Sequence, residues 1–181
     1  MLFHFNVNLN DQDYLDYNIF WMLRSPYGKK QLIKFRMLLT LIFAVACFFV
    51  LFNGNFSQNS FWAIIPLLIL FIVVQVLFNT FFIHALKGQL KSQKKTGKMG
   101  YSPSAKIEFH EETFVETTPN NKTEQKYTAV ERISVIENKS IYIHVNTVMA
   151  YILPFSSFTS TAQYEEFLAF MKTKCENIDT Y

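Results

Sequence analysis

The side chains that could perform metal or acid–base chemistry are few in this chain, and their spacing does not favour one shared site. The four histidines, His4, His84, His110 and His144, are far apart in the sequence. No two of them have the i, i+4 spacing with which a helix presents a pair of ligands to a metal, and no cysteine lies near them. Three fall on expected strands, on the face opposite the apolar side chains. We therefore expect solvated or interfacial histidines and no metal site.

The acidic side chains include two adjacent pairs, Glu111-Glu112 and Glu165-Glu166. Acid–base catalysis needs two carboxyl groups that face one substrate with separated pKa values, which neighbours in sequence seldom achieve. The first pair is expected in a hairpin turn, and the second in the early turns of a helix, where negative charge suits the helix dipole. The five glycines form no phosphate-binding loop, and no nucleophile elbow is present. These patterns favour a protein that is not an enzyme and holds no cofactor.

Two apolar runs without a charged residue, Met37–Phe52 and Phe61–Ile83, dominate the first half of the chain. At about 1.5 Å per residue the second run makes a helix about 34 Å long, enough for a hydrocarbon core of about 30 Å. The first run is long enough when it is counted from Leu32, because Lys34 and Arg36 can extend to the lipid headgroups. Both runs are therefore predicted to be membrane-spanning helices.

The two spans are predicted to form a transmembrane helical hairpin over residues 32–85, with spans at about 32–52 and 61–83. Polar side chains inside it need partners, because hydrocarbon offers none. Thr40 and Gln75 are expected at similar depth in an antiparallel hairpin, and we predict a hydrogen bond between them. No ionisable side chain lies near the middle of either span, which argues against an ion or proton pathway.

Charge is strongly segregated along the chain. The stretch from Tyr17 to Ile107 contains eleven Lys and Arg residues and no Asp or Glu, whereas residues 108–181 carry eleven acidic and six basic residues. The basic residues flank both spans on one side. By the positive-inside rule, both termini are expected in the cytoplasm and residues 53–60 outside, which makes this a multi-pass protein of the cell membrane.

The lysines that follow the second span can be interpreted in two ways. Either they only set the orientation of the spans in the membrane, or they attract anionic lipid in addition. The second is worth about 1 kcal/mol for each lysine near the surface. The candidate lipid-contacting residues are Lys87, Lys91, Lys94, Lys95 and Lys98. The expected membrane-interface anchors are Trp21, Arg36 and Trp62. Nucleic-acid binding is not expected, because no cytosolic surface pairs aromatic with basic residues.

The N-terminal arm, residues 1–31, is predicted to contain a strand and an amphipathic helix. Apolar and polar side chains alternate over residues 2–9, which is typical of a half-buried strand. A helix rich in aromatic residues is expected to begin after a cap at Asn10 or Asp11, and a turn is expected at Ser25–Gly28. We predict that the strand joins the C-terminal sheet, because its apolar face needs a surface to cover.

A basic linker at 86–104, helical only in its first half, is expected to lead into a β-rich cytosolic domain at 105–181. The predicted strands are Lys106–His110, Thr113–Thr117, Gln125–Val130, Arg132–Glu137, residues 141–146 and Val148–Leu153. A helix follows from Thr161 to about Asn177. The fold class is therefore an α+β membrane protein: a two-helix transmembrane hairpin plus a small antiparallel domain with a C-terminal helix. With the N-terminal strand, the domain has the element count of a pleckstrin-homology-like (PH-like) barrel.

Several phrases of the sequence resemble the YcxB-like family of bacterial membrane proteins. They are NLNDQDYLDYNIFWMLRSPYGKK before the first span, KIEFHEETFVETT after the second, and AYILPFSSF at residues 150–158 before the last helix. The resemblance covers nearly the whole chain, and its motifs are structural. It implies a bacterial cytoplasmic membrane, that of a low-GC Gram-positive organism, and it supplies no catalytic residues.

The sequence favours a membrane-anchored interaction module that is not an enzyme. Its expected partners are the lipid bilayer and a protein that the sequence does not identify; a homo-oligomer is compatible with it. One alternative is that the PH-like domain senses anionic lipid headgroups, although the acidic balance of the domain argues against this. A second alternative is an enzyme acting on a membrane substrate, which would require histidine and glutamate side chains to converge in one cavity.

Overall fold

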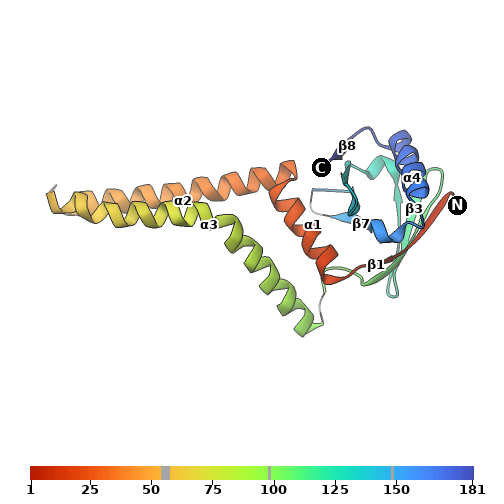
Figure 1. Cartoon of the computed structure of the whole chain (residues 1–181), viewed down its shortest axis with the longest axis horizontal. Helices are drawn as coiled ribbons and strands as arrows, with labels where there is room; N and C mark the ends of the chain where they lie inside the picture. Colours follow the sequence, from red (N-terminus) through yellow and green to blue (C-terminus); the bar gives the residue numbers. More distant parts are fainter. Residues whose placement is uncertain (54–57, 98, 148) are drawn as a thin grey trace. The chain divides into compact units, whose positions relative to one another are not determined.

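The computed structural model describes residues 1–53, 58–97, 99–147 and 149–181. These residues form two compact units, each with its own internal packing. The strand-rich unit contains residues 1–17 and 93–181, and the hairpin unit contains residues 18–92. Figure 1 shows the strands gathered in the first unit and two long helices in the second.

The first sheet of the strand-rich unit unites the two ends of the sequence. Its order is β1 (Phe3–Asn8), β2 (Ser104–Phe109), β3 (Thr113–Thr117) and β4 (Lys122–Lys126). All its pairings are antiparallel, and β1 pairs with β2 from Phe3 opposite Phe109 to Asn8 opposite Ser104. The prediction that the N-terminal strand joins the C-terminal sheet is thereby confirmed.

The second sheet adds a short strand that the sequence analysis missed. Its order is β7 (Ala150–Pro154), β6 (Ser140–His144), β5 (Arg132–Ile136) and β8 (Ile178–Thr180). The pairing of β5 with β8 is parallel and the others are antiparallel. Asn138 has a φ of 56° in the β5–β6 connection, a left-handed conformation that asparagine tolerates well.

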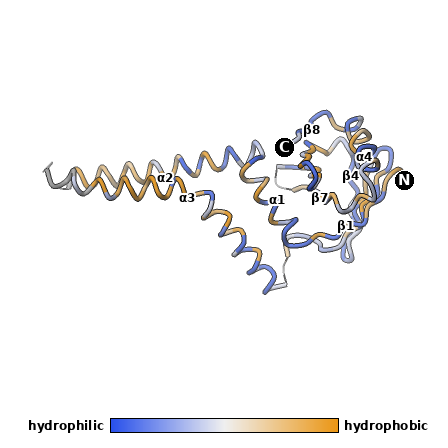
Figure 2. Tube along the Cα trace, in the orientation of Figure 1, coloured by the Kyte–Doolittle hydropathy of each residue, from blue (hydrophilic) through white to orange (hydrophobic). Residues whose placement is uncertain are grey.

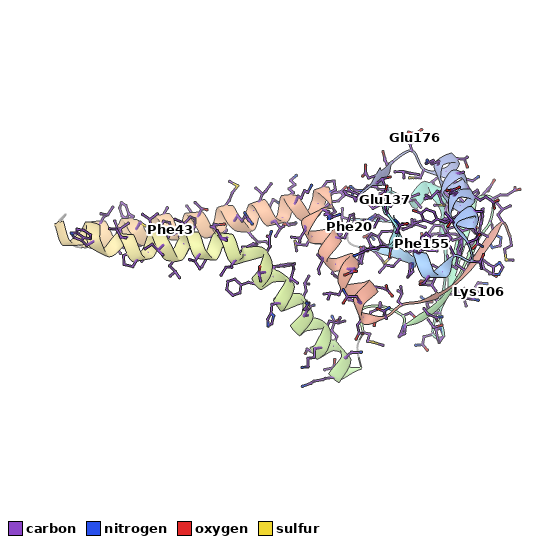
Figure 3. The ribbon with its side chains drawn as sticks, in the orientation of Figure 1. Phe20, Phe43, Lys106, Glu137, Phe155 and Glu176 are labelled. Carbon is purple, nitrogen blue, oxygen red and sulfur yellow. The ribbon has the colours of Figure 1, made fainter. Side chains whose placement is uncertain are left out.

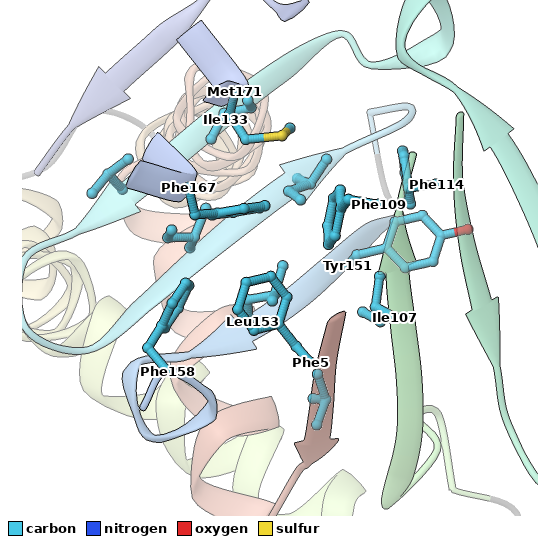
Figure 4. Packing of buried hydrophobic residues seen from close by; sticks show 14 of the residues in the cluster. Phe5, Ile107, Phe109, Phe114, Ile133, Tyr151, Leu153, Phe158, Phe167 and Met171 are labelled. Atoms are coloured by element: carbon cyan, nitrogen blue, oxygen red, sulfur yellow. The ribbon is translucent and has the colours of Figure 1, made fainter. Parts of the chain in front are cut away.

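Phenylalanine rings fill the space between the sheets and the helix α4 (Thr161–Lys174). Phe167 of α4 is fully buried, with its ring centroid 5.0 Å from that of Phe5 and 4.8 Å from that of Phe109. Met171, one turn later, is also fully buried. Figure 4 shows these side chains converging from β1, β2 and α4. The α+β class, with antiparallel sheets and a helix near the C-terminus, is confirmed.

The second sheet is covered on its other face as well. Ser134, Tyr142 and Ile152 are cross-strand neighbours on β5, β6 and β7, and all three are buried. The start of helix α1 (Asp11–Leu23) lies against this face, with the Tyr17 ring centroid 5.1 Å from that of Tyr142. Every residue of β6 is therefore buried, although its alternating sequence predicts one polar, solvated face.

Several boundaries in the strand-rich unit differ from the prediction, most of them by one or two residues, and Val148, the first residue of the predicted strand Val148–Leu153, lies outside the described residues. The predicted strand Gln125–Val130 is wrong in both bounds: β4 spans Lys122–Lys126, and the chain continues as a 3₁₀ turn, η1 (Tyr127–Ala129), where the Tyr127 hydroxyl donates to the carbonyl oxygen of His110 at 2.9 Å. Helix α4 ends at Lys174, before the predicted Asn177, and the extended chain that follows forms β8.

The junction between α1 and α2 (Pro26–Asn53) is shorter than the predicted turn. The predicted cap of α1 is confirmed, because the Asn10 side-chain oxygen accepts from the backbone N–H of Gln12 and Asp13. Pro26 opens α2, which suits a residue without an N–H, and the Ser25 hydroxyl accepts from the N–H of Gly28 at 3.0 Å. Gly28 is thus a helical residue.

The hairpin unit contains two helices that are long and apolar enough to cross a membrane. An 18-residue window within Pro26–Leu51 of α2 has a mean hydropathy of 2.2, and one within Ile64–Thr96 of α3 (Gln58–Thr96) has a mean hydropathy of 2.5. Figure 2 shows hydrophobic colouring along both. Helix α3 continues through the first half of the predicted linker, as expected. Of the predicted outer loop at residues 53–60, residues 54–57 lie outside the described part of the chain.

Candidate functional site

The two helices of the hairpin unit pack against each other in antiparallel fashion. The rings of Phe43 on α2 and Phe71 on α3 stack with their centroids 4.3 Å apart, and Arg36 on α2 reaches Asn79 on α3. Residue numbers therefore rise along α2 as they fall along α3. Figure 3 labels Phe43 and shows side chains projecting outward along both helices.

Arg36 turns its charged end toward α3. Its Nη2 donates to the Asn79 Oδ1 at 3.3 Å, and its guanidinium carbon lies 5.6 Å from the centroid of the Phe78 ring. Arginine has five N–H donors, so one hydrogen bond to an amide leaves capacity for a further acceptor. The role of Arg36 as a membrane-interface anchor stays a prediction, but its side chain is held in place by α3.

The predicted hydrogen bond between Thr40 and Gln75 is wrong. The Thr40 hydroxyl instead donates to the backbone carbonyl of Arg36 at 2.8 Å, one turn earlier on its own helix. A threonine in a helix often satisfies its hydroxyl in this way. The Gln75 amide has no hydrogen bond to any residue in the described part of the chain, so the two side chains share a surface without bonding to each other.

A groove of about 950 Å³ runs along one side of this helix pair. Its residues are Ile33, Arg36, Met37, Leu38, Thr40, Leu41, Ala44, Phe71 and Gln75. Most of these side chains are apolar, and the polar ones are Arg36 at one end and Thr40 and Gln75 further along. An apolar groove of this size with a few polar groups has the character of a site for an amphiphilic ligand.

The other predicted lipid-contacting residues and anchors do not join this groove. Lys87 and Lys91 are exposed on α3, and Lys98 lies outside the described residues. Trp62 is 71% exposed, whereas Trp21 is half-buried and its carbonyl accepts from the Ser25 hydroxyl. Their contacts with lipid remain predictions.

Lys94, also on α3, belongs to a small cluster in the strand-rich unit. Its ammonium group forms an ion pair with Asp11 at the start of α1, and the Tyr101 hydroxyl donates to the other carboxylate oxygen of Asp11 at 2.7 Å. The bond from Lys94 lowers the pKa of Asp11, whereas burial and the bond to Asp11 raise the pKa of Tyr101 to about 12. Lys94 therefore already has a carboxylate partner, while the adjacent Lys95 is exposed.

His144 lies on the face of the second sheet that α1 covers. It is 3% exposed, and its ring centroid is 6.2 Å from that of Tyr17. Burial, with a smaller contribution from Arg132, lowers the pKa of His144 to about 4. Burial likewise raises the pKa of Tyr17 to about 12. The expectation of a solvated or interfacial histidine is therefore wrong here: the ring is neutral near pH 7 and packed within the unit.

The comparison with known families identifies part of this unit. Residues 109–171 match the sequence model of a family described as YcxB-like protein. The C-terminal part of this chain is a YcxB-like domain. The matched segment runs from the end of β2 to Met171 of α4, so the domain's first sheet is completed by β1 from the other end of the chain. Neither the curated proteins nor the solved structures yielded a match.

The YcxB-like domain does not gather its titratable side chains into one centre. His110 lies at the β2–β3 connection in the first sheet, whereas His144 lies on β6 in the second. Within the described ranges, no group of three or more His, Cys, Asp or Glu residues has the arrangement of a metal site. Glu111-Glu112 is exposed in the β2–β3 connection, where a hairpin turn was predicted.

Sequence reasoning found the polar members of the groove but not the groove. Thr40 and Gln75 were singled out because a polar side chain between apolar neighbours needs a partner. The hollow beside them depends on how α2 and α3 pack and on the small side chain of Ala44, which no periodicity reveals. The burial of the second sheet's other face, with Ser134, Tyr142 and Ile152, was not predicted for a similar reason: the helix α1 that covers this face lies far away in the sequence.

Proposed function

We propose that this chain is a membrane-anchored interaction protein, in which the hairpin of α2 and α3 crosses the bilayer and holds the YcxB-like domain at the cytoplasmic face. One observation carries the proposal: the hairpin exposes large apolar side chains along both helices, whereas the strand-rich unit buries its own in a core. A monomer in water rarely exposes so continuous an apolar surface. If the hairpin is surrounded by the hydrocarbon of a bilayer, these apolar side chains are not exposed to water.

The pairing of β1 with β2 supports two crossings. β1 precedes the hairpin in sequence and β2 follows it, and the two form one antiparallel ladder. A sheet cannot be shared across a bilayer, so the chain must return to the side from which it started. The excess of Lys and Arg next to both helices then favours the cytoplasm for that side.

The anchored domain acts by raising the local concentration of its recognition surface at the membrane. The edge strand β4 is the surface that fits a protein partner best. Its exposed residues Lys122, Glu124 and Lys126 alternate in charge, which discourages pairing with a second copy and leaves main-chain groups for a partner strand of complementary charge. No catalytic step is part of the proposal.

Co-purification tests the proposal. The full chain is tagged at its C-terminus, expressed at native level, extracted in mild detergent and analysed by mass spectrometry. We expect a stoichiometric protein partner that is lost in Lys126→Glu on β4 and retained in Lys172→Glu, a matched charge reversal on the exposed face of α4. Recovery of the chain from the soluble fraction contradicts the anchor, and the absence of any partner contradicts the interaction role.

Headgroup sensing is a second candidate function, and the exposed Lys87, Lys91 and Lys95 on α3, outside the residues that match the YcxB-like family, would supply the attraction to anionic lipid. It predicts that anionic lipid alone is recovered with the chain. Neutralising those three lysines together should then release the lipid, because each contributes about 1 kcal/mol of attraction to an anionic surface. The excess of acidic residues at 108–181 favours the interaction role over this one.

A further inference from the structure

The groove between α2 and α3 combines features that point to one kind of occupant. Its walls are apolar side chains, including Met37, Leu41 and Phe71. At one end stands Arg36, which a bond to Asn79 holds against α3. A cation at the end of an apolar groove matches a ligand that has an anionic head and a hydrocarbon tail.

The Gln75 amide adds a second polar position at a defined depth. Gln75 lies on α3 beside Thr40 of α2, and Thr40 is four residues, or about 6 Å, deeper than Arg36. Because the Thr40 hydroxyl is bonded to the Arg36 carbonyl, it does not supply the partner that Gln75 needs. Gln75 has no hydrogen bond within the described residues, and its NH₂ group can donate to an acceptor in the groove.

We propose that the groove binds one anionic glycerophospholipid. Its phosphate group lies against Arg36, an ester carbonyl accepts from the Gln75 amide about one helical turn deeper, and an acyl chain follows Met37, Leu41 and Ala44. The inference rests on the proposed membrane-spanning hairpin. Its preference for an anionic lipid follows from charge, because no acidic residue lies between Tyr17 and Ile107 to oppose the headgroup.

The test measures lipid that remains with the purified full chain. The protein is reconstituted in nanodiscs of equal phosphatidylglycerol and phosphatidylcholine, transferred to mild detergent, and examined by native mass spectrometry. We expect one phosphatidylglycerol per chain to be retained. Loss of the charged contact in Arg36→Gln should lower that retention about tenfold. Lys34→Gln, an exposed charge at the same end that does not line the groove, should leave it unchanged.

A second pair of variants tests the acyl-chain part without changing charge. Ala44→Phe fills the groove and should release the lipid, whereas Val45→Phe adds the same ring at the next position, which does not line the groove, and should not. Equal loss in both members of either pair would mean loosely bound boundary lipid and would overturn the proposal. Equal retention of the two lipids would overturn the anionic preference.

A second copy of the chain is the competing occupant, and the same samples detect it. A dimer in the native mass spectrum that persists in Lys34→Gln and is lost in Ala44→Phe, with no lipid attached, would overturn the lipid proposal. The anchor is judged separately, by whether the chain resists extraction from membranes with alkaline carbonate. A chain that is integral but retains no lipid contradicts this inference alone, whereas a chain released by carbonate contradicts the anchor as well.

Discussion

The strand-rich unit and the hairpin unit use the same residue type for opposite purposes. Phe109 and Phe167 are fully buried in the strand-rich unit, whereas Phe35 and Phe81 of the hairpin are 52% and 61% exposed. In water, burying such a ring is worth about 1.5–3 kcal/mol, which is why the first unit closes around its phenylalanines. Lipid tails are as apolar as a ring, so under the proposed membrane-spanning arrangement the hairpin would gain nothing from burying its phenylalanines. The surroundings, not the side chain, decide where an apolar residue lies.

Truncating one ring in each unit tests this contrast and gives the largest expected effect. Phe167→Ala should destabilise the strand-rich unit by about 3–5 kcal/mol, because it leaves a cavity among packed rings. Phe81→Ala removes the same atoms from an exposed position of the hairpin unit and should leave the stability of the hairpin unit unchanged. Hydrogen exchange in the full, detergent-solubilised chain measures both, with the β2, β5 and β6 amides reporting on the strand-rich unit and the α2 and α3 amides on the hairpin unit. An equal loss of protection in the two variants would refute the contrast.

Acidification should affect the two units differently, because only the strand-rich unit contains a buried histidine, His144. The pKa of His144 is about 4 when folded and about 6.5 when unfolded, so between these values the unfolded chain binds more protons. Stability is therefore full above about pH 6.5 and falls by about 3 kcal/mol as the pH drops toward 4.

The histidine's share of this pH dependence is measured by substitution. His144→Gln should flatten the stability of the strand-rich unit between pH 6.5 and 4, whereas His110→Gln should leave the slope as it is. Helix content of the hairpin, followed by circular dichroism at pH values in the same range, should stay constant. A slope that survives His144→Gln would assign it to other groups.

Two glycines of the hairpin unit should respond in opposite directions to the same substitution. A Cβ on Gly28 would overlap the carbonyl oxygen of Trp21 and lie 2.6 Å from the Met22 Cα, so Gly28→Ala should cost about 1–3 kcal/mol at the α1–α2 junction. Nothing lies within 4 Å of a Cβ on Gly88, and Gly88→Ala should stabilise α3 by up to about 1 kcal/mol through helix propensity. Thermal unfolding of the full chain in detergent distinguishes them.

The smallest expected effect concerns the exposed ion pair at the start of α1. Asp11→Asn removes the carboxylate that holds Lys94 and accepts from Tyr101, so the pKa of Tyr101 should fall below about 12 but stay raised, because burial, the larger cause, is unchanged. An absorbance titration of tyrosine, with Tyr101→Phe as the reference for assignment, measures this change. Overall stability should alter little, because surface ion pairs contribute little.

Much of the fold follows from the local sequence pattern. The parts that could not be predicted are those that depend on a partner element. The alternation of Phe3, Phe5 and Val7 predicted a strand that needs a sheet, and β1 supplies that edge. The alternation also predicted that His144 lies on a solvent-exposed face. This prediction is wrong because the sequence of one strand does not reveal that α1 covers that face. The strand β8 has only three residues, two of them polar, and so carries no periodic signal.

The candidate site was predictable only in its chemistry. Arg36, Thr40 and Gln75 stand out in the sequence as polar residues in or beside apolar runs. That Arg36 bonds to Asn79, that Thr40 bonds back to its own helix, and that Gln75 is left facing a groove are consequences of how two helices pack. Apolar helices of this kind have many acceptable registers, and composition alone does not choose among them.

The pairing of β1 with β2 also determines how long β1 lacks its partner strand during synthesis of the chain. Between Asn8, where β1 ends, and Ser104, where β2 begins, the ribosome must add 96 residues, 104 minus 8. At about 5–20 residues per second the finished strand waits roughly 5–20 s for its partner. Until then Phe3, Phe5 and Val7 have no sheet to cover. The apolar face of the earliest strand therefore stays without its native partner until both helices of the hairpin unit have been made.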